Sequence, residues 1–156
     1  MTTEPKSVST PDELPRRHHV CPWWVGYLIA SPLRKLGEDP EALLGPHVKP
    51  GMTAVDIGCA MGFFSLPLAR MVGPTGRVIC VDVQQRMLSS LEKRAQRKGL
   101  HPIVETRLCS QEDLGLNDLR CTFDLALAVH VAHETAYPRR FFSQTFEALR
   151  PGGRLL

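Results

Sequence analysis

Residues 56–62, DIGCAMG, combine the residue types that hold a ligand against the main chain. Gly58 and Gly62 lack a Cβ, so a ligand can lie directly against the peptide groups there. Asp56 adds a negative charge two residues before the first glycine. Apolar stretches flank the run on both sides, which is typical of a turn between a buried strand and a helix. Two interpretations follow, a ligand-binding turn and an ordinary tight turn in which nearby amides satisfy Asp56.

The spacing in this glycine loop (residues 58–62) differs from that of dinucleotide-binding loops. Those loops carry G-x-G-x-x-G, whereas this chain has Gly58, Ala60 and Gly62, with Phe63 where the third glycine belongs. Asp56 also lies in the path that a pyrophosphate would take. A ligand that carries positive charge therefore suits the loop better.

Strand and helix patterns alternate around the glycine loop. Nearly continuous apolar runs predict strands at residues 53–57, 77–83, 102–108 and 122–131, and amphipathic runs predict helices at 63–72, 86–98 and 141–149. This alternation predicts an α/β fold with a doubly wound, mostly parallel sheet. In such a sheet the ligand lies outside the carboxyl ends of the strands, which is where the first strand delivers the glycine loop.

The N-terminal third is organised differently. Residues 1–19 are rich in Ser, Thr, Pro and charge, and we expect a flexible tail. Residues 20–50 predict a helical cap, in which Asp39 caps a short helix that starts at Pro40. Trp23 and Trp24 in this segment are either part of a lid over the site or a cover for the core. Residues 51–156 form the α/β unit.

Composition limits the cellular setting. The net charge is only +3 and the basic residues are scattered, so the sequence argues against a nucleic-acid partner. Five cysteines without a CxxC pair indicate reduced, buried thiols and a cytoplasmic protein. No apolar run reaches the ~18 residues of a membrane span, so no membrane association is expected. His18, His19 and Cys21 lack a fourth ligand, and we predict no metal site.

Four segments together resemble the motifs of class I S-adenosylmethionine-dependent methyltransferases. They are VDIGCAMG, VICVDVQQRML, FDLALAVHVAHE and ALRPGGRLL, in the order and spacing of that family. The chain is most similar to members that methylate small molecules, a group that includes ubiquinone and menaquinone biosynthesis enzymes. The resemblance implies a Rossmann-like fold, S-adenosyl-L-methionine as cofactor, S-adenosyl-L-homocysteine as product and a small-molecule methyl acceptor.

The resemblance also implies a cofactor site. In it, Gly58 and its neighbours take the methionine moiety, Asp56 organises the loop amides and the cofactor's ammonium, Asp82 accepts the ribose hydroxyls and Val83 packs on the adenine. Ala60 replaces the middle glycine of the family loop, and we expect it to fit if its φ is negative. The complete implied set is Asp56, Gly58, Cys59, Ala60, Gly62, Asp82, Val83, Ser110, Gln111, Ala128 and His130.

Methyl transfer from a sulfonium depends chiefly on alignment and on exclusion of water, so no universal catalytic residue is required. For a phenol, enol or thiol acceptor a base would help, and His130, His133 and Glu134 are the candidates by position. A purely structural role is the alternative for each of them. The motifs therefore indicate the cofactor more sharply than the acceptor.

The family sheet has seven strands, and this sequence stops as the fifth begins. We therefore expect a C-terminally incomplete fold with an open sheet edge, and a chain that either self-associates as a homo-oligomer through that edge or is marginally stable. The alternative function is a non-catalytic S-adenosylmethionine-binding or assembly module. A nucleic-acid methyltransferase has little support, because no aromatic-proline tetrad follows the fourth strand.

Overall fold

The computed structural model describes residues 38–131 and 135–156 of the 156-residue chain. The predicted tail, most of the predicted cap, His133 and Glu134 lie outside the described residues. The described elements follow one another as α2 (Pro40–Leu44), β1 (Thr53–Ile57), α3 (Ser65–Val72), β2 (Arg77–Asp82), α4 (Gln85–Arg97), β3 (Val104–Leu108), η3 (Asn117–Leu119), β4 (Phe123–Leu127), α5 (Pro138–Ala148) and β5 (Leu149–Leu155).

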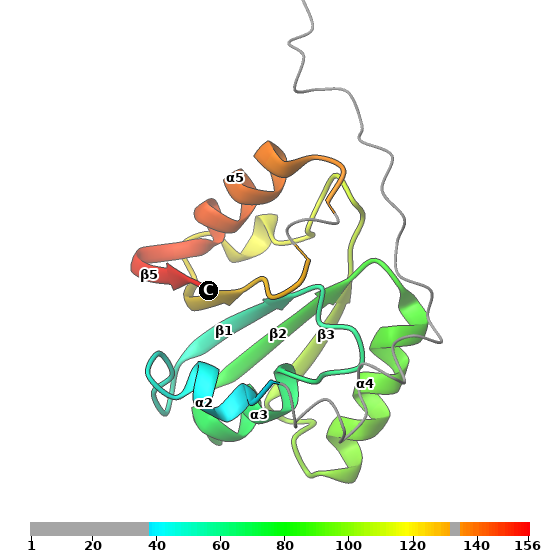
Figure 1. The fold of residues 1–156 in the computed structure, drawn as a ribbon, viewed down its shortest axis with the longest axis vertical. Helices are drawn as coiled ribbons and strands as arrows, with labels where there is room; N and C mark the ends of the chain where they lie inside the picture. Colours follow the sequence, from blue (N-terminus) through cyan, green and yellow to red (C-terminus); the bar gives the residue numbers. More distant parts are fainter. Residues whose placement is uncertain (1–37, 132–134) are drawn as a thin grey trace, which may run out of the picture.

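The strands form one parallel sheet in the order β3-β2-β1-β4-β5. Helices α2, α3 and α4 cover one face, and α5 and η3 cover the other (Figure 1). The strand order reverses between β1 and β4. The chain therefore leaves β1 toward α3 on one face of the sheet and leaves β4 toward α5 on the other face. The predicted doubly wound α/β fold is confirmed.

Two apolar cores lie on the two faces of the sheet. Along β1, Ala54 packs into the core beneath α3 and α4, whereas Val55 packs into the core beneath α5. Val78 and Ile79 alternate in the same way along β2. Because both faces are covered, β2 is continuously apolar from Val78 to Val81 and β1 is apolar at Ala54, Val55 and Ile57.

The helices begin and end close to the predicted residues. The Asp39 side chain accepts a hydrogen bond from the Glu41 amide at 2.9 Å, so the predicted cap of α2 is confirmed. Pro67 is tolerated in α3 because it lies in the first turn, where amides have no partner within the helix. Helix α4 buries Met87, Leu88, Leu91 and Ala95, as its periodicity predicts.

Two strand predictions need correction. The fourth strand ends at Leu127 rather than at residue 131, and residues 128–131 continue as a loop. The fifth strand, of which the sequence predicts only the beginning, covers seven residues, and it pairs with β4 at Leu149, Arg154 and Leu155 with a register shift between the first and the last two positions. The outer strands of the described sheet are therefore β3 and β5.

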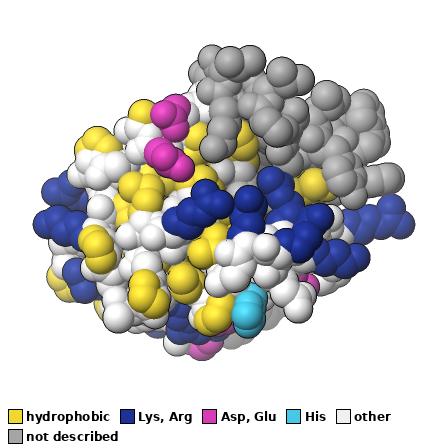
Figure 2. All heavy atoms as spheres, turned by 90° about the horizontal axis from the view of Figure 1, so that it is seen from below, with side chains coloured by type: hydrophobic (Ala, Val, Ile, Leu, Met, Phe, Trp, Pro, Cys, Tyr) yellow, Lys and Arg dark blue, Asp and Glu magenta, His cyan; other side chains and the backbone are white. Residues whose placement is uncertain are grey.

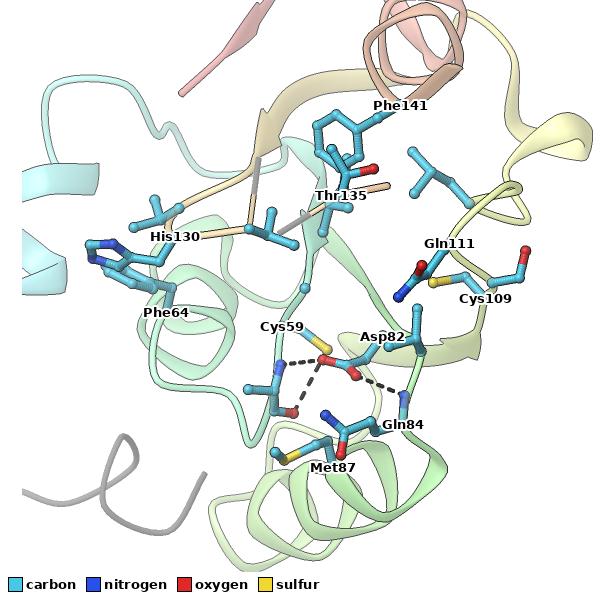
Figure 3. A pocket seen from close by; sticks show the side chains of 18 of the residues that line it. Cys59, Phe64, Asp82, Gln84, Met87, Cys109, Gln111, His130, Thr135 and Phe141 are labelled. Atoms are coloured by element: carbon cyan, nitrogen blue, oxygen red, sulfur yellow. Dashed lines mark hydrogen bonds between the residues drawn. The ribbon is translucent and has the colours of Figure 1, made fainter. Parts of the chain in front are cut away.

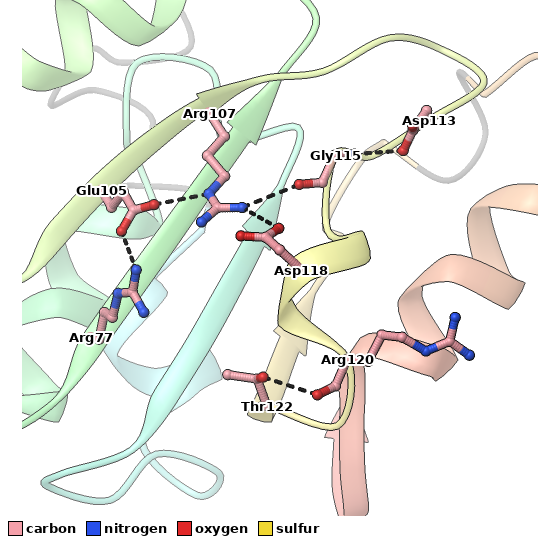
Figure 4. A network of polar contacts seen from close by, with 8 residues as sticks. All are labelled: Arg77, Glu105, Arg107, Asp113, Gly115, Asp118, Arg120 and Thr122. Atoms are coloured by element: carbon pink, nitrogen blue, oxygen red, sulfur yellow. Dashed lines mark hydrogen bonds and ion pairs between the residues drawn. The ribbon is translucent and has the colours of Figure 1, made fainter.

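A polar network fastens the β3 edge to the segment before β4 (Figure 4). Arg107 donates to Asp118 at 2.7 Å, to Glu105 at 2.9 Å and to the Gly115 carbonyl at 3.3 Å. Arg77 on β2 pairs with the same Glu105. The network thus holds η3 against the sheet on the side opposite α4.

Thiol burial is mixed in the described residues. Cys59 and Cys80 are buried as predicted, whereas Cys109 is half-buried and Cys121 is exposed. Cys121 lies in the turn before β4 rather than in a strand, which explains its exposure. None of the helices in residues 38–131 and 135–156 has the length and apolar character needed to cross a membrane.

Candidate functional site

A cavity of about 190 Å³ opens at the carboxyl ends of β1, β2 and β4 (Figure 3). This is the edge of the sheet at which the strand order reverses, where ligands of open α/β sheets bind. Most of the residues predicted to hold the cofactor line this one cavity, namely Gly58, Cys59, Ala60, Asp82, Val83, Ser110, Gln111 and His130.

Asp82 is the last residue of β2, and its carboxylate faces the glycine loop. One oxygen accepts from the Ala60 amide at 2.9 Å and the other from the Gln84 amide at 2.8 Å, while the residue is only 7% exposed. Burial raises the pKa of Asp82, and the amides of Gln84, Ala60 and Val83 oppose that shift. A carboxylate offers about four lone-pair positions, so Asp82 can accept further hydrogen bonds from a ligand.

The two glycines of the loop are required by packing as well as by backbone conformation. Gly58 has φ +73, and a Cβ there would lie 2.6 Å from Val131 Cγ2. Gly62 has φ +83, and a Cβ there would lie 2.3 Å from Leu91 Cδ1 on α4. Gly58 lies on the cavity wall, whereas Gly62 lies behind it and lets α4 approach the loop.

Ala60 does not have the negative φ under which we expected it to fit the loop. Its φ is +47, not negative, so this alanine adopts a conformation that costs an L-residue about 1–2 kcal/mol. Its amide points at the Asp82 carboxylate, and that hydrogen bond helps to hold the strained residue. A second bond, from the Gly62 amide to the Cys59 carbonyl at 2.9 Å, closes the turn over residues 59–62.

Asp56 and Ala128 do not line the cavity. Asp56 is 4% exposed and accepts a hydrogen bond from the Ser65 hydroxyl at the start of α3, instead of organising the loop amides as expected. Burial raises the pKa of Asp56 to about 7, the Ser65 hydroxyl lowers it and Asp82 raises it. The Ala128 amide donates to the Leu156 carbonyl, and Ala128 packs against the core beneath α5.

His130 lies at the rim of the cavity after β4. Its φ is +60 and its Nε2 is 3.0 Å from the Glu38 carboxylate. The imidazole is 61% exposed, so it is accessible from solvent. His133 and Glu134 lie outside the described residues.

The sequence did not single out the apolar side of the cavity. Phe64, Val131, Thr135 and Phe141 line it opposite the polar side formed by Asp82, Gln84, Ser110 and Gln111 (Figure 3). Thr135 and Phe141 come from the segment after β4, and only the fold brings them to the glycine loop. The positions directly after the strands were the available signal; they account for Cys109 after β3, but not for Val131, which lies in the loop beyond the end of β4.

Charge on the cavity wall is sparse. Among the described lining residues, Asp82 carries the only carboxylate, and neither Lys nor Arg is present. The described residues also contain no group of three or more His, Cys, Asp or Glu side chains that could hold a metal ion. The wall is thus compatible with a ligand that carries positive charge and hydroxyl groups.

Comparison with known proteins places these features in a family context. The family model described as "Methyltransferase domain" matches residues 55–156. A solved structure of a SAM-dependent methyltransferase from Aquifex aeolicus superimposes with a TM-score of 0.81 at 27% identity, over 87% of this chain and 71% of that one.

Curated relatives are similar over most of this chain. A demethylmenaquinone methyltransferase from Symbiobacterium thermophilum is 30% identical over 74% of this chain and 45% of its own length. A ubiquinone biosynthesis O-methyltransferase from Methylobacterium sp. is 32% identical over 87% of this chain and 51% of its own length. The chain thus spans about half the length of these two relatives.

Proposed function

Because this chain belongs to the methyltransferase domain family, we propose that it transfers a methyl group from S-adenosylmethionine to a small-molecule acceptor. The observation that carries the proposal is the buried Asp82 carboxylate, which faces the glycine loop at the edge where the strand order reverses. The similar Aquifex aeolicus protein is a SAM-dependent methyltransferase, which supports the same cofactor here.

The described residues fit that cofactor. When bound, S-adenosylmethionine supplies an electrophilic methyl group on a positively charged sulfur. In this proposal Asp82 accepts the ribose hydroxyls, because a carboxylate at a strand end can take both. Val83 packs against the adenine, while the Gly58 backbone borders the methionine portion. The absence of Lys and Arg from the described lining residues leaves the sulfonium free of repulsion.

The apolar side of the cavity supports an acceptor with an aromatic or apolar body. Phe64 and Phe141 offer ring surfaces there, and the Thr135 hydroxyl adds one polar group. One of the two curated relatives is named for demethylmenaquinone and the other for ubiquinone biosynthesis, which is consistent with such an acceptor. For an acceptor with an ionisable hydroxyl, His130 at the rim is our candidate base, and His133 and Glu134 remain candidates by position.

Turnover separates this proposal from a non-catalytic binding module. The purified chain, incubated with S-adenosylmethionine and a panel of phenols and quinols, should form S-adenosylhomocysteine, and Asp82→Asn should reduce its rate. Tight binding of the cofactor with no product from any acceptor would favour the module. No binding at all would contradict both.

We infer a cytoplasmic setting and self-association as parts of the same proposal. The four cysteines in the described part of the chain are free thiols, which supports a reducing compartment. Self-association is supported by the outer position of β5 and by Phe146 on α5, which is 78% exposed.

A further inference from the structure

Among the basic residues at the C-terminal end of α4, Arg94 differs from its neighbours in burial and in hydrogen bonding. Lys93, Arg97 and Lys98 are exposed, and Lys and Arg side chains are prominent on this side of the molecule (Figure 2). Arg94 is half-buried, and its Nη1 donates to the Met61 carbonyl at 2.7 Å. The periodicity of the sequence predicts that these four basic residues share one solvated face. In the structure, the Arg94 side chain instead contacts the glycine loop.

Met61 lies inside the strained turn of that loop. The turn over residues 59–62 carries Ala60 at φ +47, and Met61 follows Ala60 directly. An alanine held at positive φ returns to ordinary backbone conformations unless its surroundings prevent it. The Ala60 amide is held by Asp82, and the Met61 carbonyl is held by Arg94, so contacts from β2 and α4 fix the two ends of this dipeptide.

A guanidinium is well suited to this task. Its hydrogen bond to a carbonyl is charge-assisted, and hydrogen bonds to charged groups are about twice as strong as neutral ones. Burial lowers the pKa of Arg94, and nearby Arg97 lowers it further, but a guanidinium remains protonated at neutral pH. The bond therefore persists across the physiological range.

We propose that Arg94 is a positioning residue that fixes the Met61 carbonyl and thereby holds the glycine loop in the conformation that accepts the cofactor. The inference rests on the proposed function, because it assigns S-adenosylmethionine to this loop. Arg94 does not line the cavity, so it acts through the loop and not on the ligand.

The first test needs no ligand. Hydrogen exchange of residues 58–62 should be faster in Arg94→Met than in the wild type, because the turn is then released on its α4 side. Lys93→Met is the matched control, since it removes one charge from the adjacent exposed position. Equal exchange in Arg94→Met and the wild type would overturn the inference.

The second test is calorimetric titration with S-adenosylhomocysteine. Arg94→Met should weaken binding by about tenfold, Arg94→Lys should recover part of that loss, and Lys93→Met should bind like the wild type. In an Ala60→Gly background the loss from Arg94→Met should be smaller, because glycine adopts positive φ without strain. A general loss of stability would not depend on residue 60 in this way.

The two tests separate this inference from the proposed function. Wild-type protein that binds S-adenosylhomocysteine while Arg94→Met binds it equally well would overturn the role of Arg94 and leave the function standing. Wild-type protein that binds neither cofactor nor product, together with faster exchange in Arg94→Met, would retain Arg94 as the residue that holds the loop and remove the assigned ligand.

Discussion

Asp56 and Asp82 lie near the ends of adjacent strands and have different partners. Asp82 faces the cavity and accepts from two backbone amides, whereas Asp56 is enclosed and accepts from Ser65. Burial raises the pKa of both carboxyls. The acidic residue of the DIGCAMG motif thus joins the end of β1 to the start of α3, and Asp82 is the carboxylate available to a ligand.

The raised pKa of Asp56 predicts a pH-dependent stability. The folded chain holds the Asp56 proton up to a pKa of about 7, while the ordinary value is 3.8. The folded state therefore binds more protons than the unfolded state between these values, and its stability should fall as pH rises from about 4 through 7. Urea unfolding at several pH values should show this slope, and Asp56→Asn should flatten it. A variant with the wild-type slope would contradict the assignment.

Gly58 should not tolerate a side chain. Gly58→Ala combines positive φ with a Cβ 2.6 Å from Val131, and we expect a loss of about 2–4 kcal/mol in the free energy of unfolding. Gly99→Ala is the matched control, because its φ is +68 and nothing lies within 4 Å of the added Cβ. It should lose about 1 kcal/mol. Equal losses of unfolding free energy in the two variants would contradict a role for the Val131 contact and leave the positive φ as the sole reason for glycine at position 58.

At the scale of elements, α4 and the glycine loop should behave as one unit. Leu91 on α4 is fully buried and lies where a Gly62 Cβ would project. Leu91→Ala should cost about 2–5 kcal/mol, and Gly62→Ala should also destabilise the fold. In the double variant the shortened residue 91 makes room for the new Cβ, so the combined loss should be smaller than the sum by about 1 kcal/mol or more. Additive losses, measured by denaturant unfolding, would contradict this contact.

Most elements could be predicted from the sequence because their apolar periodicity matches their burial. The buried face of α4 and the apolar runs of β1 and β2 are of this kind. The end of β4 could not be predicted, because Val129 and Val131 continue the apolar pattern of the strand although they lie in the loop that lines the cavity. The positive φ of Ala60 and the Asp56–Ser65 bond depend on tertiary contacts that no local pattern contains.

At the scale of the whole molecule, the side formed by α5 and β5 is the expected surface for self-association. Phe142 and Phe146 are exposed on α5, and Leu155 is exposed on β5. We expect a molar mass above that of the monomer in light scattering at high protein concentration. Phe146→Ser should shift the protein toward monomer with little change in stability, because this side chain is largely in solvent. A wild-type monomer at all concentrations would contradict the expectation.

Binding of the cofactor at Asp82 is the central claim, and calorimetric titration tests it most directly. S-adenosylmethionine and S-adenosylhomocysteine should each bind the wild-type chain at a single site, and Asp82→Ala should weaken both by about tenfold or more, since a charged acceptor is lost. Circular dichroism of the variant should confirm that it is folded. Wild-type protein that is folded but binds neither compound, or a folded Asp82→Ala that binds both as tightly as the wild type, would contradict the account.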